Sequence, residues 1–354
     1  MIFESIKNEA FEQIIFCHDS QVDLRAIVAL HSTVLGPAVG GCRMWNYASE
    51  AEALTDVLRL SKGMTYKAAI SELNWGGGKA VIIGDPKIDK TERKFERFGE
   101  FVERLGGHYI TAKDVGTNAE DLKCIKRKTS HILGIEGETG SSGDPSPATA
   151  WGVFHGMRSC VKHTYGANTI KGLTIALQGL GSVSYYLIEH LLADGAKIIG
   201  CDIDQEKINR IAQKYHIEIT RPDSIYDVAC DIFSPSALGA SINENTLPRI
   251  RAKVIAGAAN NQLSMSEIGY EILRKGLIYA PDYAINAGGL INIYHEKMFP
   301  AKFSEGYNHK RAFDHVERIG ITISEILDRS KREKIPTHKI ADTIVEERIK
   351  KARK

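Results

Sequence analysis

The second half of the chain alternates short apolar runs with longer stretches of helical periodicity, and this alternation limits the possible folds more than any other feature. The apolar runs lie near residues 173–178, 197–201, 229–233, 253–257 and 277–281. Strands separated by helices are typical of a parallel sheet, because one parallel strand reaches the next only through a crossover connection. We therefore predict a doubly wound α/β domain in this half.

A polar segment rich in glycine and proline, residues 137–147, predicts a boundary between two domains. The chain has 354 residues, which is enough for two domains of typical size. We expect an α/β domain over residues 1–140 and the doubly wound domain over residues 141–310. Helices over residues 311–354 are expected to pack back toward the first domain.

The first domain is predicted to combine strands with one long amphipathic helix. Residues 24–35 indicate a strand, and residues 80–83 indicate another that follows the loop Gly76-Gly77-Gly78-Lys79. A capping box, Ser49-Glu50-Ala51-Glu52, begins a helix that runs to the high 60s. This helix carries Lys67 near its far end, and the glycine loop brings a second lysine to the strand.

Composition and charge exclude several classes of function. The chain carries 46 basic and 44 acidic residues, interspersed to a net charge of +2, so neither nucleic acid nor a membrane is an expected partner. Its six cysteines are scattered singly, which predicts reduced thiols and neither disulfides nor a metal site. The first nine residues contain two acids and no apolar run, and no apolar span of membrane length occurs, so we expect a cytoplasmic protein.

A glycine-rich turn follows the first apolar run of the second half. Gly179 and Gly181 lie directly after residues 173–178, and Ser182 and Val183 begin the helix that follows. Glycines at these positions permit a tight turn and let a pyrophosphate approach the backbone N–H groups at the helix N-terminus. The same turn alone also occurs without any ligand.

An acidic residue ends the next apolar run and strengthens this interpretation. Asp202 lies about 20 residues beyond the glycines, where an acid can bind the 2′-hydroxyl of a ribose. Asp204 follows and no arginine is adjacent, so a 2′-phosphate would meet two negative charges. The sequence therefore predicts a Rossmann-like domain that binds NAD in preference to NADP.

The lysines of the first domain admit several interpretations. A P-loop is excluded for the loop before Lys79, because Leu73 and Ala80 occupy the places of the required glycine and hydroxyl residue. If Lys67 and Lys79 face each other, repulsion and desolvation would lower the pKa of one lysine and make it a general base. The alternative is two solvated lysines on the surface.

Six motifs, in order along nearly the whole chain, resemble the Glu/Leu/Phe/Val amino-acid dehydrogenase superfamily, and within it most the leucine dehydrogenases. They lie at residues 36–41, 62–67, 76–79, 111–117, 257–263 and 281–289. The resemblance implies NAD-dependent oxidative deamination of a branched-chain L-amino acid (leucine, also valine and isoleucine) to the 2-oxo acid, ammonia and NADH. It also implies a homo-oligomer, commonly an octamer.

The resemblance assigns roles to individual residues. It implies that Lys67 binds the substrate carboxylate, that Lys79 is the general base that activates water, and that Asp114 relays protons to and from the amino group. Further substrate contacts are implied for Gly40, Gly41, Met64 and Asn261. Nicotinamide contacts are implied for Thr149 and Asn260. The walls of an apolar side-chain pocket are implied to be Val39, Ala112, Leu290 and Ile293.

The sequence departs from the leucine dehydrogenase pattern at several positions. Lys113 stands where an acid is expected, and a cation beside Asp114 would lower the pKa of that carboxyl group. The other departures are Cys42 for threonine, Ser184 for alanine, Ser236 for cysteine and Leu290 for valine. Leu290, as the bulkier residue, bears on the choice of amino acid.

Three alternatives remain beside the leucine type. A phenylalanine- or tryptophan-type enzyme is the first, because the sequence of residues 288–291 also occurs in aromatic-specific relatives. A glutamate dehydrogenase is disfavoured, because Val39 occupies the place of the lysine that binds the side-chain carboxylate. A catalytically silent NAD-binding protein is the third, and the presence of Lys67, Lys79 and Asp114 together argues against it.

Overall fold

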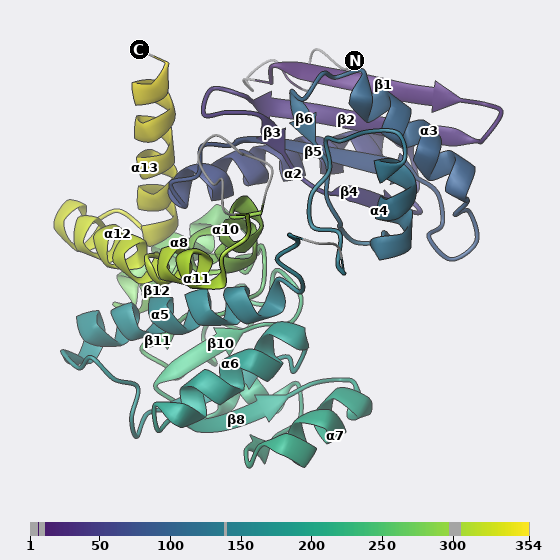
Figure 1. The fold of residues 1–354 in the computed structure, drawn as a ribbon. Coiled ribbons are helices and arrows are strands. Elements are labelled where there is room, and N and C mark those ends of the chain that lie inside the picture. Colours follow the sequence, from purple (N-terminus) through teal and green to yellow (C-terminus); the bar gives the residue numbers. More distant parts are fainter. Residues whose placement is uncertain (1–5, 7–10, 138–139, 297–305, 354) are drawn as a thin grey trace. The chain divides into compact units, whose positions relative to one another are not determined.

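The computed structural model describes residues 6, 11–137, 140–296 and 306–353 (Figure 1). The chain forms two compact units. Unit 1 consists of Met1–Gly143, Ile293–Tyr307 and Val345–Lys354, and unit 2 consists of Asp144–Asn292 and Asn308–Ile344. Each unit contains its own six-stranded sheet.

The sheet of unit 1 is mixed. Its strands are β1 (Gln13–Asp19), β2 (Leu24–Ser32), β3 (Ala38–Val39), β4 (Cys42–Trp45), β5 (Gly76–Ile83) and β6 (Tyr109–Ile110). The order is β1-β2-β5-β3-β6, and β4 also pairs with β5. β2 is antiparallel to both β1 and β5, whereas β3 and β4 run parallel to β5. β5 therefore pairs with three strands, β2, β3 and β4.

Three helices of unit 1 are capped by side chains. They are α2 (Glu50–Ile70), α3 (Glu92–Glu103) and α4 (Ala119–Lys126). The capping residues Ser49, Thr91 and Asn118 each accept a hydrogen bond from a backbone N–H of the first turn. These bonds satisfy donors that an α-helix leaves open and so define where each helix begins.

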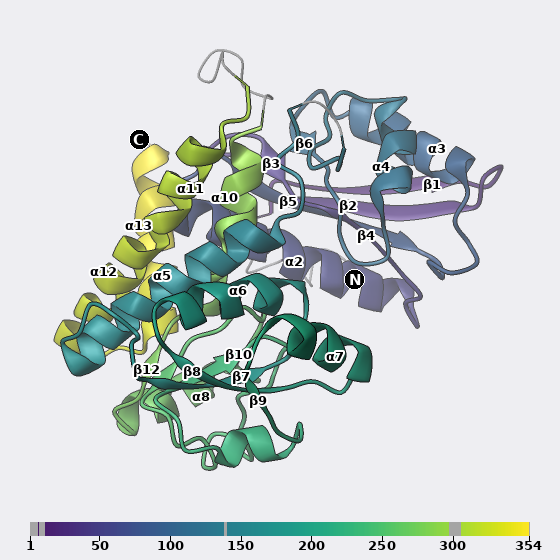
Figure 2. The same cartoon turned by 60° about the horizontal axis from the view of Figure 1, so that its bottom comes forward.

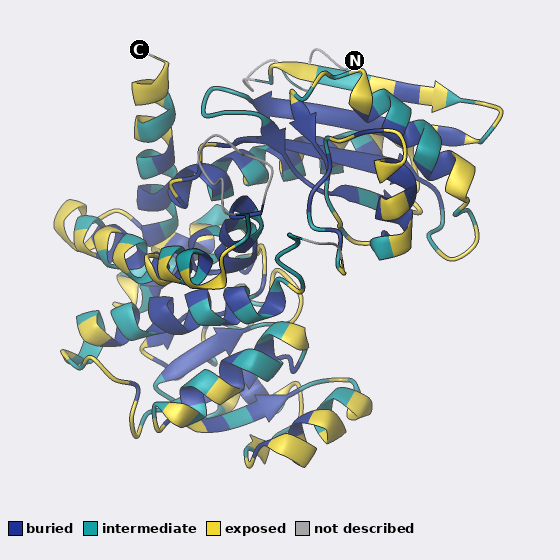
Figure 3. Cartoon of the chain, in the orientation of Figure 1, coloured by how far each residue is buried: buried dark blue, intermediate teal, exposed yellow. Residues whose placement is uncertain are grey.

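The two faces of this sheet are covered by different helices, because successive side chains of a strand point to opposite faces. One face packs Ile27, Ala29, Val81 and Ile83 against buried residues of α2. The other face packs Val28, Leu30, Ala80 and Ile82 against buried residues of α3 and α4. β5 is consequently buried along its whole length, as its colour in Figure 3 shows.

The sheet of unit 2 is entirely parallel. Its strands are β7 (Thr174–Gln178), β8 (Lys197–Cys201), β9 (Glu218–Ile219), β10 (Ile232–Pro235), β11 (Val254–Ile255) and β12 (Ile278–Tyr279). The order is β12-β11-β10-β7-β8-β9, so the chain winds outward in both directions from the pair β7 and β10. Ligands of such sheets bind at the carboxyl ends of the strands where the winding reverses.

Helices connect these strands and continue beyond them. They are α5 (Ser146–Tyr165), α6 (Ser182–Ala193), α7 (Gln205–Lys214), η1 (Ser224–Asp227), α8 (Ser266–Arg274), α9 (Asp282–Ile285), α10 (Gly288–Tyr294), α11 (His309–Glu317), α12 (Ile319–Glu333) and α13 (Thr337–Ala352). Figure 2 shows α5 and α6 along one face of the sheet. The last turns of α13 belong to unit 1, where Arg348 donates hydrogen bonds to the carbonyls of Ala69 and Leu73.

Two further observations concern composition. All six cysteines are free thiols. Among the described residues no helix is both long and apolar enough to cross a membrane.

Candidate active site

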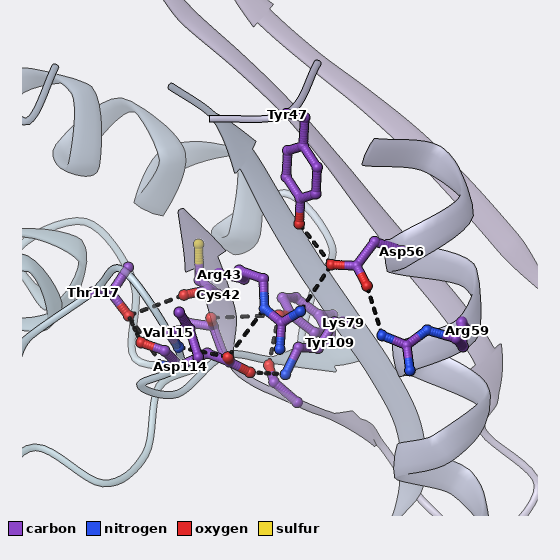
Figure 4. A network of polar contacts seen from close by, with 12 residues as sticks. Cys42, Arg43, Tyr47, Asp56, Arg59, Lys79, Tyr109, Asp114, Val115 and Thr117 are labelled. Carbon is purple, nitrogen blue, oxygen red and sulfur yellow. Dashed lines mark hydrogen bonds and ion pairs between the residues drawn. The ribbon is translucent and has the colours of Figure 1, made fainter. Parts of the chain in front are cut away.

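Lys79 is a lysine buried inside a sheet. It lies in β5, its side chain is only 6% exposed, and its amine forms an ion pair with the carboxylate of Asp114 (Figure 4). Burial, together with the positive charges of Arg43 and Lys67, lowers the pKa of Lys79 to about 7. A buried amine with such a pKa exchanges protons near neutral pH, which a solvated lysine does not do.

The three glycines before Lys79 belong to the strand rather than to a loop. A Cβ atom added to Gly77 would lie 2.0 Å from the backbone nitrogen of Thr65 on α2, and one added to Gly76 would lie 1.9 Å from the carbonyl oxygen of Ser32. A Cβ atom added to Gly78 would lie 2.8 Å from the ring of Tyr109. The glycines therefore let α2 and neighbouring chain segments approach β5 closely, which is why the strand begins at Gly76 and not at Ala80.

Gly40 and Gly41 stand between β3 and β4 and contact the same region. A Cβ atom on Gly40 would meet the carbonyl oxygen of Gly78 at 1.8 Å and the Cγ of Met64 at 3.3 Å. A Cβ atom on Gly41 would meet the Cβ of Asp114 at 2.9 Å. The structure thus brings Gly40, Gly41, Met64 and Asp114 together around Lys79.

The pocket residues expected from the sequence lie in both units. Val39 is 2% exposed and pairs with Gly77 of β5 and with Ile110 of β6. The carbonyl of Ala112 accepts a hydrogen bond from the N–H of Cys42. Leu290 is half-buried in unit 2 and Ile293, on the same helix α10, is assigned to unit 1, with its Cδ1 near Gly134.

The glycine turn of unit 2 has the form expected of a dinucleotide site. Gly179 has a φ of +97°, and a Cβ atom there would lie 2.8 Å from Ala237, so only glycine fits. A Cβ atom on Gly181 meets nothing within 4 Å, and helix α6 begins at Ser182 without a side-chain cap. Open space before a free helix N-terminus fits the pyrophosphate of a dinucleotide. Val183 lies in the first turn of the same helix.

Ser184, a departure from the expected alanine, has a bonding role here. Its hydroxyl donates a hydrogen bond of 2.6 Å to the carbonyl of Gly179 and is buried. Ser236 has a comparable role, because its hydroxyl accepts a hydrogen bond from the N–H of Ala258 at 3.2 Å. Both serine hydroxyls therefore form hydrogen bonds with backbone groups of loops that follow the carboxyl ends of strands.

Asp202, at the end of β8, contacts the glycine turn directly. Its Oδ2 accepts a hydrogen bond from the N–H of Leu180 at 2.8 Å, and its Oδ1 accepts one from the N–H of Asp204 at 2.9 Å. The amine of Lys207 lies 3.8 Å from Asp202 and 3.6 Å from Asp204. The positive charge of Lys207 therefore offsets part of the negative charge of the two acids. The sequence did not indicate this contact, because Lys207 lies three residues beyond Asp204, on α7.

The expected nicotinamide contacts Thr149 and Asn260, and the expected substrate contact Asn261, lie on one helix and one loop of unit 2. Asn260 and Asn261 follow β11, and Asn261 has a φ of +51°. The side-chain amide of Asn286 donates a hydrogen bond of 2.9 Å to Oδ1 of Asn260. The hydroxyl of Thr149, on α5, accepts a hydrogen bond from the N–H of Gly289 at 3.1 Å. Gly289 directly precedes Leu290, so Thr149 lies close to an expected pocket residue.

Comparison with known proteins agrees with this geometry. Residues 12–131 match the family model described as Glu/Leu/Phe/Val dehydrogenase, dimerisation domain, and residues 140–207 and 202–354 match the model described as Glutamate/Leucine/Phenylalanine/Valine dehydrogenase. A leucine dehydrogenase of Bacillus cereus is 48% identical over 98% of this chain and 93% of its own length. The chain belongs to the Glu/Leu/Phe/Val dehydrogenase family.

Other members of the family are also similar. A phenylalanine dehydrogenase of Caldalkalibacillus thermarum is 43% identical over 96% of this chain and 91% of its own length. The crystal structure of an L-tryptophan dehydrogenase from Nostoc punctiforme has a TM-score of 0.87 at 36% identity, and the two chains cover each other completely. The resemblance and the two-domain α/β fold predicted from the sequence are confirmed, and the chain is an amino-acid dehydrogenase of a family that uses nicotinamide dinucleotides.

The sequence did not reveal all ion-pair partners of Asp114. Lys113 forms an ion pair with Glu136, whereas Arg43 and Lys79 form ion pairs with the carboxylate of Asp114. The cation expected to lower the pKa of Asp114 was Lys113, but the guanidinium of Arg43 lies closer to that carboxylate. Arg43 lies two residues after Gly41 in the first motif, which was the available signal.

Asp56, Tyr47 and Thr117 were also missed. Asp56 lies within the predicted amphipathic helix, and no motif distinguishes it from the other polar residues of that helix. Its hydrogen bonds to Arg43 and Tyr47 exist only once α2 packs on the sheet. Among the described residues no group of histidine, cysteine or acidic side chains is arranged to hold a metal ion.

Proposed function

We propose that this dehydrogenase uses NAD to oxidise L-leucine, and also L-valine and L-isoleucine, to the 2-oxo acid with release of ammonia. The observation that carries the proposal is the ion pair of the buried Lys79 with the partly buried Asp114, with Gly41 packed against Asp114 and Gly40 packed against Gly78 and Met64. It joins an amine of near-neutral pKa to a carboxylate, which are the two groups that deamination by water needs. The preference for leucine is supported by the 48% identity to leucine dehydrogenase.

Lys67 binds the substrate carboxylate in this proposal, and it holds the α-carbon in place. Asp114 takes a proton from the substrate ammonium, so that the nitrogen lone pair can form the C=N bond. Bound NAD supplies a two-electron acceptor for the hydride that leaves the α-carbon. Gly179, Gly181, Ser182 and Val183 would hold its pyrophosphate, Asp202 its ribose, and Thr149 and Asn260 its nicotinamide.

Hydrolysis of the imine uses the same two side chains. Neutral Lys79 takes a proton from water while the water oxygen bonds to the imine carbon. Asp114 then returns its proton to the nitrogen of the carbinolamine, and the C–N bond breaks to release ammonia. The hydroxyl proton is released as the carbonyl forms, and Lys79 releases the proton that it took from water. Ammonia takes up one of these two protons to become ammonium, so each turnover releases one proton overall. Asn261 contributes a polar contact to the substrate.

The choice of NAD over NADP rests on Asp202. Its side chain is 8% exposed, and a ribose 2′-hydroxyl can donate to its remaining acceptor positions, whereas a phosphate would approach two carboxylates. The proposal further includes a homo-oligomer, with an octamer as the expected form, and a cytoplasmic location. Apart from its amino-acid and 2-oxo-acid substrates and ammonia, it includes no nucleic-acid or membrane partner.

A substrate screen tests the function. We expect NADH formation to be fastest with leucine, followed by valine and isoleucine, and to be negligible with glutamate. An enzyme of the phenylalanine or tryptophan type is the second candidate, supported by the 36% identity and full coverage of the tryptophan dehydrogenase structure. A higher kcat/KM for an aromatic amino acid would replace the leucine proposal. Absence of activity with every amino acid and either cofactor would leave a silent NAD-binding protein.

A further inference from the structure

One guanidinium bridges the proposed proton relay to a second carboxylate. The Nε of Arg43 lies 3.3 Å from Oδ1 of Asp114, and its Nη1 lies 2.8 Å from Oδ2 of Asp56 (Figure 4). Arg43 lies on β4, Asp114 follows β6, and Asp56 lies on α2. Three separate elements of unit 1 are thereby joined by one side chain, which is 21% exposed.

Asp56 is well suited to hold that guanidinium. Its side chain is 16% exposed, and its Oδ2 accepts a second hydrogen bond from the hydroxyl of Tyr47 at 2.7 Å. Its Oδ1 faces the more exposed side of the helix, where it accepts a hydrogen bond from Arg59 at 2.9 Å. Arg59 is 54% exposed, so this outer contact contributes little.

Asp114 has separate partners for its two oxygens. Its Oδ2 forms the ion pair with Lys79, while its Oδ1 contacts Arg43 and the N–H of Val115 at 2.5 Å. The loop itself is held by Thr117, which accepts from the N–H of Asp114 and donates to the carbonyl of Cys42. The backbone is thus fixed by Thr117, but the rotation of the carboxylate is set by what binds Oδ1.

We propose that Asp56 and Arg43 are positioning residues: Asp56 holds Arg43, and Arg43 holds Oδ1 of Asp114 so that Oδ2 is presented to Lys79. This inference rests on the roles proposed above for Lys79 and Asp114. A carboxylate that relays protons between substrate nitrogen and water must keep its orientation through both steps, and a displacement of about 1 Å can cost on the order of 100-fold in rate. Neither residue touches the reacting atoms in this proposal.

The two residues also have opposite electrostatic effects on the amine. The charged and titratable groups that act on Lys79 are Cys42 and Arg43 on β4, Asp56 and Lys67 on α2, and Asp114 after β6. Arg43 lowers the pKa of Lys79, and Asp56 raises it. Loss of Arg43 should therefore raise that pKa, and loss of Asp56 should lower it.

Four variants separate positioning from a general structural role. Arg43→Lys keeps the charge but cannot bridge two carboxylates, and Asp56→Asn keeps the shape but loses the charge. We expect both to lower kcat by about 10- to 100-fold, with the KM for the amino acid changed by less than about 3-fold. Asp56→Glu should recover part of the loss. Arg59→Ala, which removes the partner of the other oxygen of the same carboxylate, should retain nearly full activity.

The pH dependence gives a second, independent readout. Lys79 acts as a base only when neutral, so kcat rises as pH passes its pKa. Asp56→Asn should move this rise to lower pH, and Arg43→Gln should move it to higher pH. The same shifts should be found without substrate or cofactor in the rate at which Lys79 reacts with a small amine-modifying reagent, measured by mass spectrometry of the peptide that contains Lys79.

The outcomes are distinguishable from failure of the proposed function. Wild-type kcat in Arg43→Lys, or shifts in the same direction for Asp56→Asn and Arg43→Gln, would overturn the positioning role. An equal loss of activity in Arg59→Ala would also overturn it. If the wild-type enzyme oxidised no amino acid, the proposed function would fail, but opposite shifts in the reactivity of Lys79 would still establish the coupling of Asp56 and Arg43 to its amine.

Discussion

Leu180 donates its backbone N–H to the carboxylate of Asp202 at 2.8 Å, so the acid that is expected to bind the ribose also fixes the glycine turn expected to bind the pyrophosphate. Leu180 lies between Gly179 and Gly181, and the carboxylate accepts a second backbone N–H, from Asp204. A change at Asp202 therefore alters two parts of the cofactor site at once. Lys207 lies within 4 Å of both acids and is 44% exposed.

The first prediction concerns cofactor choice. Asp202→Ser should weaken the binding of NAD on the order of 10-fold or more, because a charge-assisted acceptor for the ribose hydroxyl and the hydrogen bond from Leu180 are both lost. It should also permit NADP, because Lys207 is then no longer held by Asp202 and can face a 2′-phosphate. Steady-state KM values for NAD and NADP measure both effects. Adding Lys207→Ala should remove the gain with NADP, and efficient use of NADP by the wild-type enzyme would contradict the interpretation of Asp202.

The second prediction concerns the base. Because the pKa of Lys79 is lowered to about 7 by burial, kcat should rise with pH through about 7 rather than near the ordinary pKa of a lysine. Lys79→Ala should lower kcat by on the order of 1000-fold or more and abolish this rise, whereas binding of NADH should persist because its expected contacts lie in unit 2. Near-normal turnover by a folded Lys79→Ala enzyme would exclude Lys79 as the base.

Much of this site could be predicted from the sequence, and the remainder has physical reasons for its absence. The glycine turn and Asp202 could be predicted because their pattern depends on neighbours close in sequence, whereas the roles of Lys67 and Lys79 are predictions that the family resemblance implies. The sequence predicts a strand that begins at Ala80, four residues after the observed beginning of β5 at Gly76. Three consecutive glycines usually indicate a loop, and their role here depends on contacts with Thr65, Ser32 and Tyr109. β9 was not predicted, because it is two residues long and exposed.

The ion pairs around Asp114 illustrate the same limit. Lys113 was expected to act on Asp114 because it is adjacent in sequence, but its amine contacts Glu136 instead. Arg43 reaches the carboxylate from β4, 71 positions away in sequence. Contacts of this kind follow from sheet order and helix packing, which a pattern of residue types does not specify.

The third prediction tests the steric role of the glycines. Gly77→Ala should destabilise unit 1 by about 1–3 kcal/mol or more, because its Cβ atom would lie 2.0 Å from backbone of α2 that cannot move independently. Gly63→Ala is the matched control within α2: its Cβ atom meets nothing within 4 Å, and alanine in a helix is favoured over glycine by about 0.5–1 kcal/mol. Thermal unfolding of both variants measures the contrast. Equal stability of the two would mean that β5 and α2 can separate without cost.

The last prediction concerns the choice of amino acid. Val39 is buried in β3 between β5 and β6, next to Gly40, so this position carries an apolar side chain and not a charged one. If it lines the side-chain pocket, leucine should be favoured over alanine by about 1–3 kcal/mol in kcat/KM, which is the contribution of a few buried methylene groups. Glutamate should be a very poor substrate, because its side-chain carboxylate would lose water without gaining a partner. Val39→Gly should enlarge the pocket and raise kcat/KM for phenylalanine relative to leucine. If the wild-type enzyme already prefers phenylalanine or tryptophan, Val39 does not limit the depth of the pocket, and the reaction type would stand with an aromatic substrate.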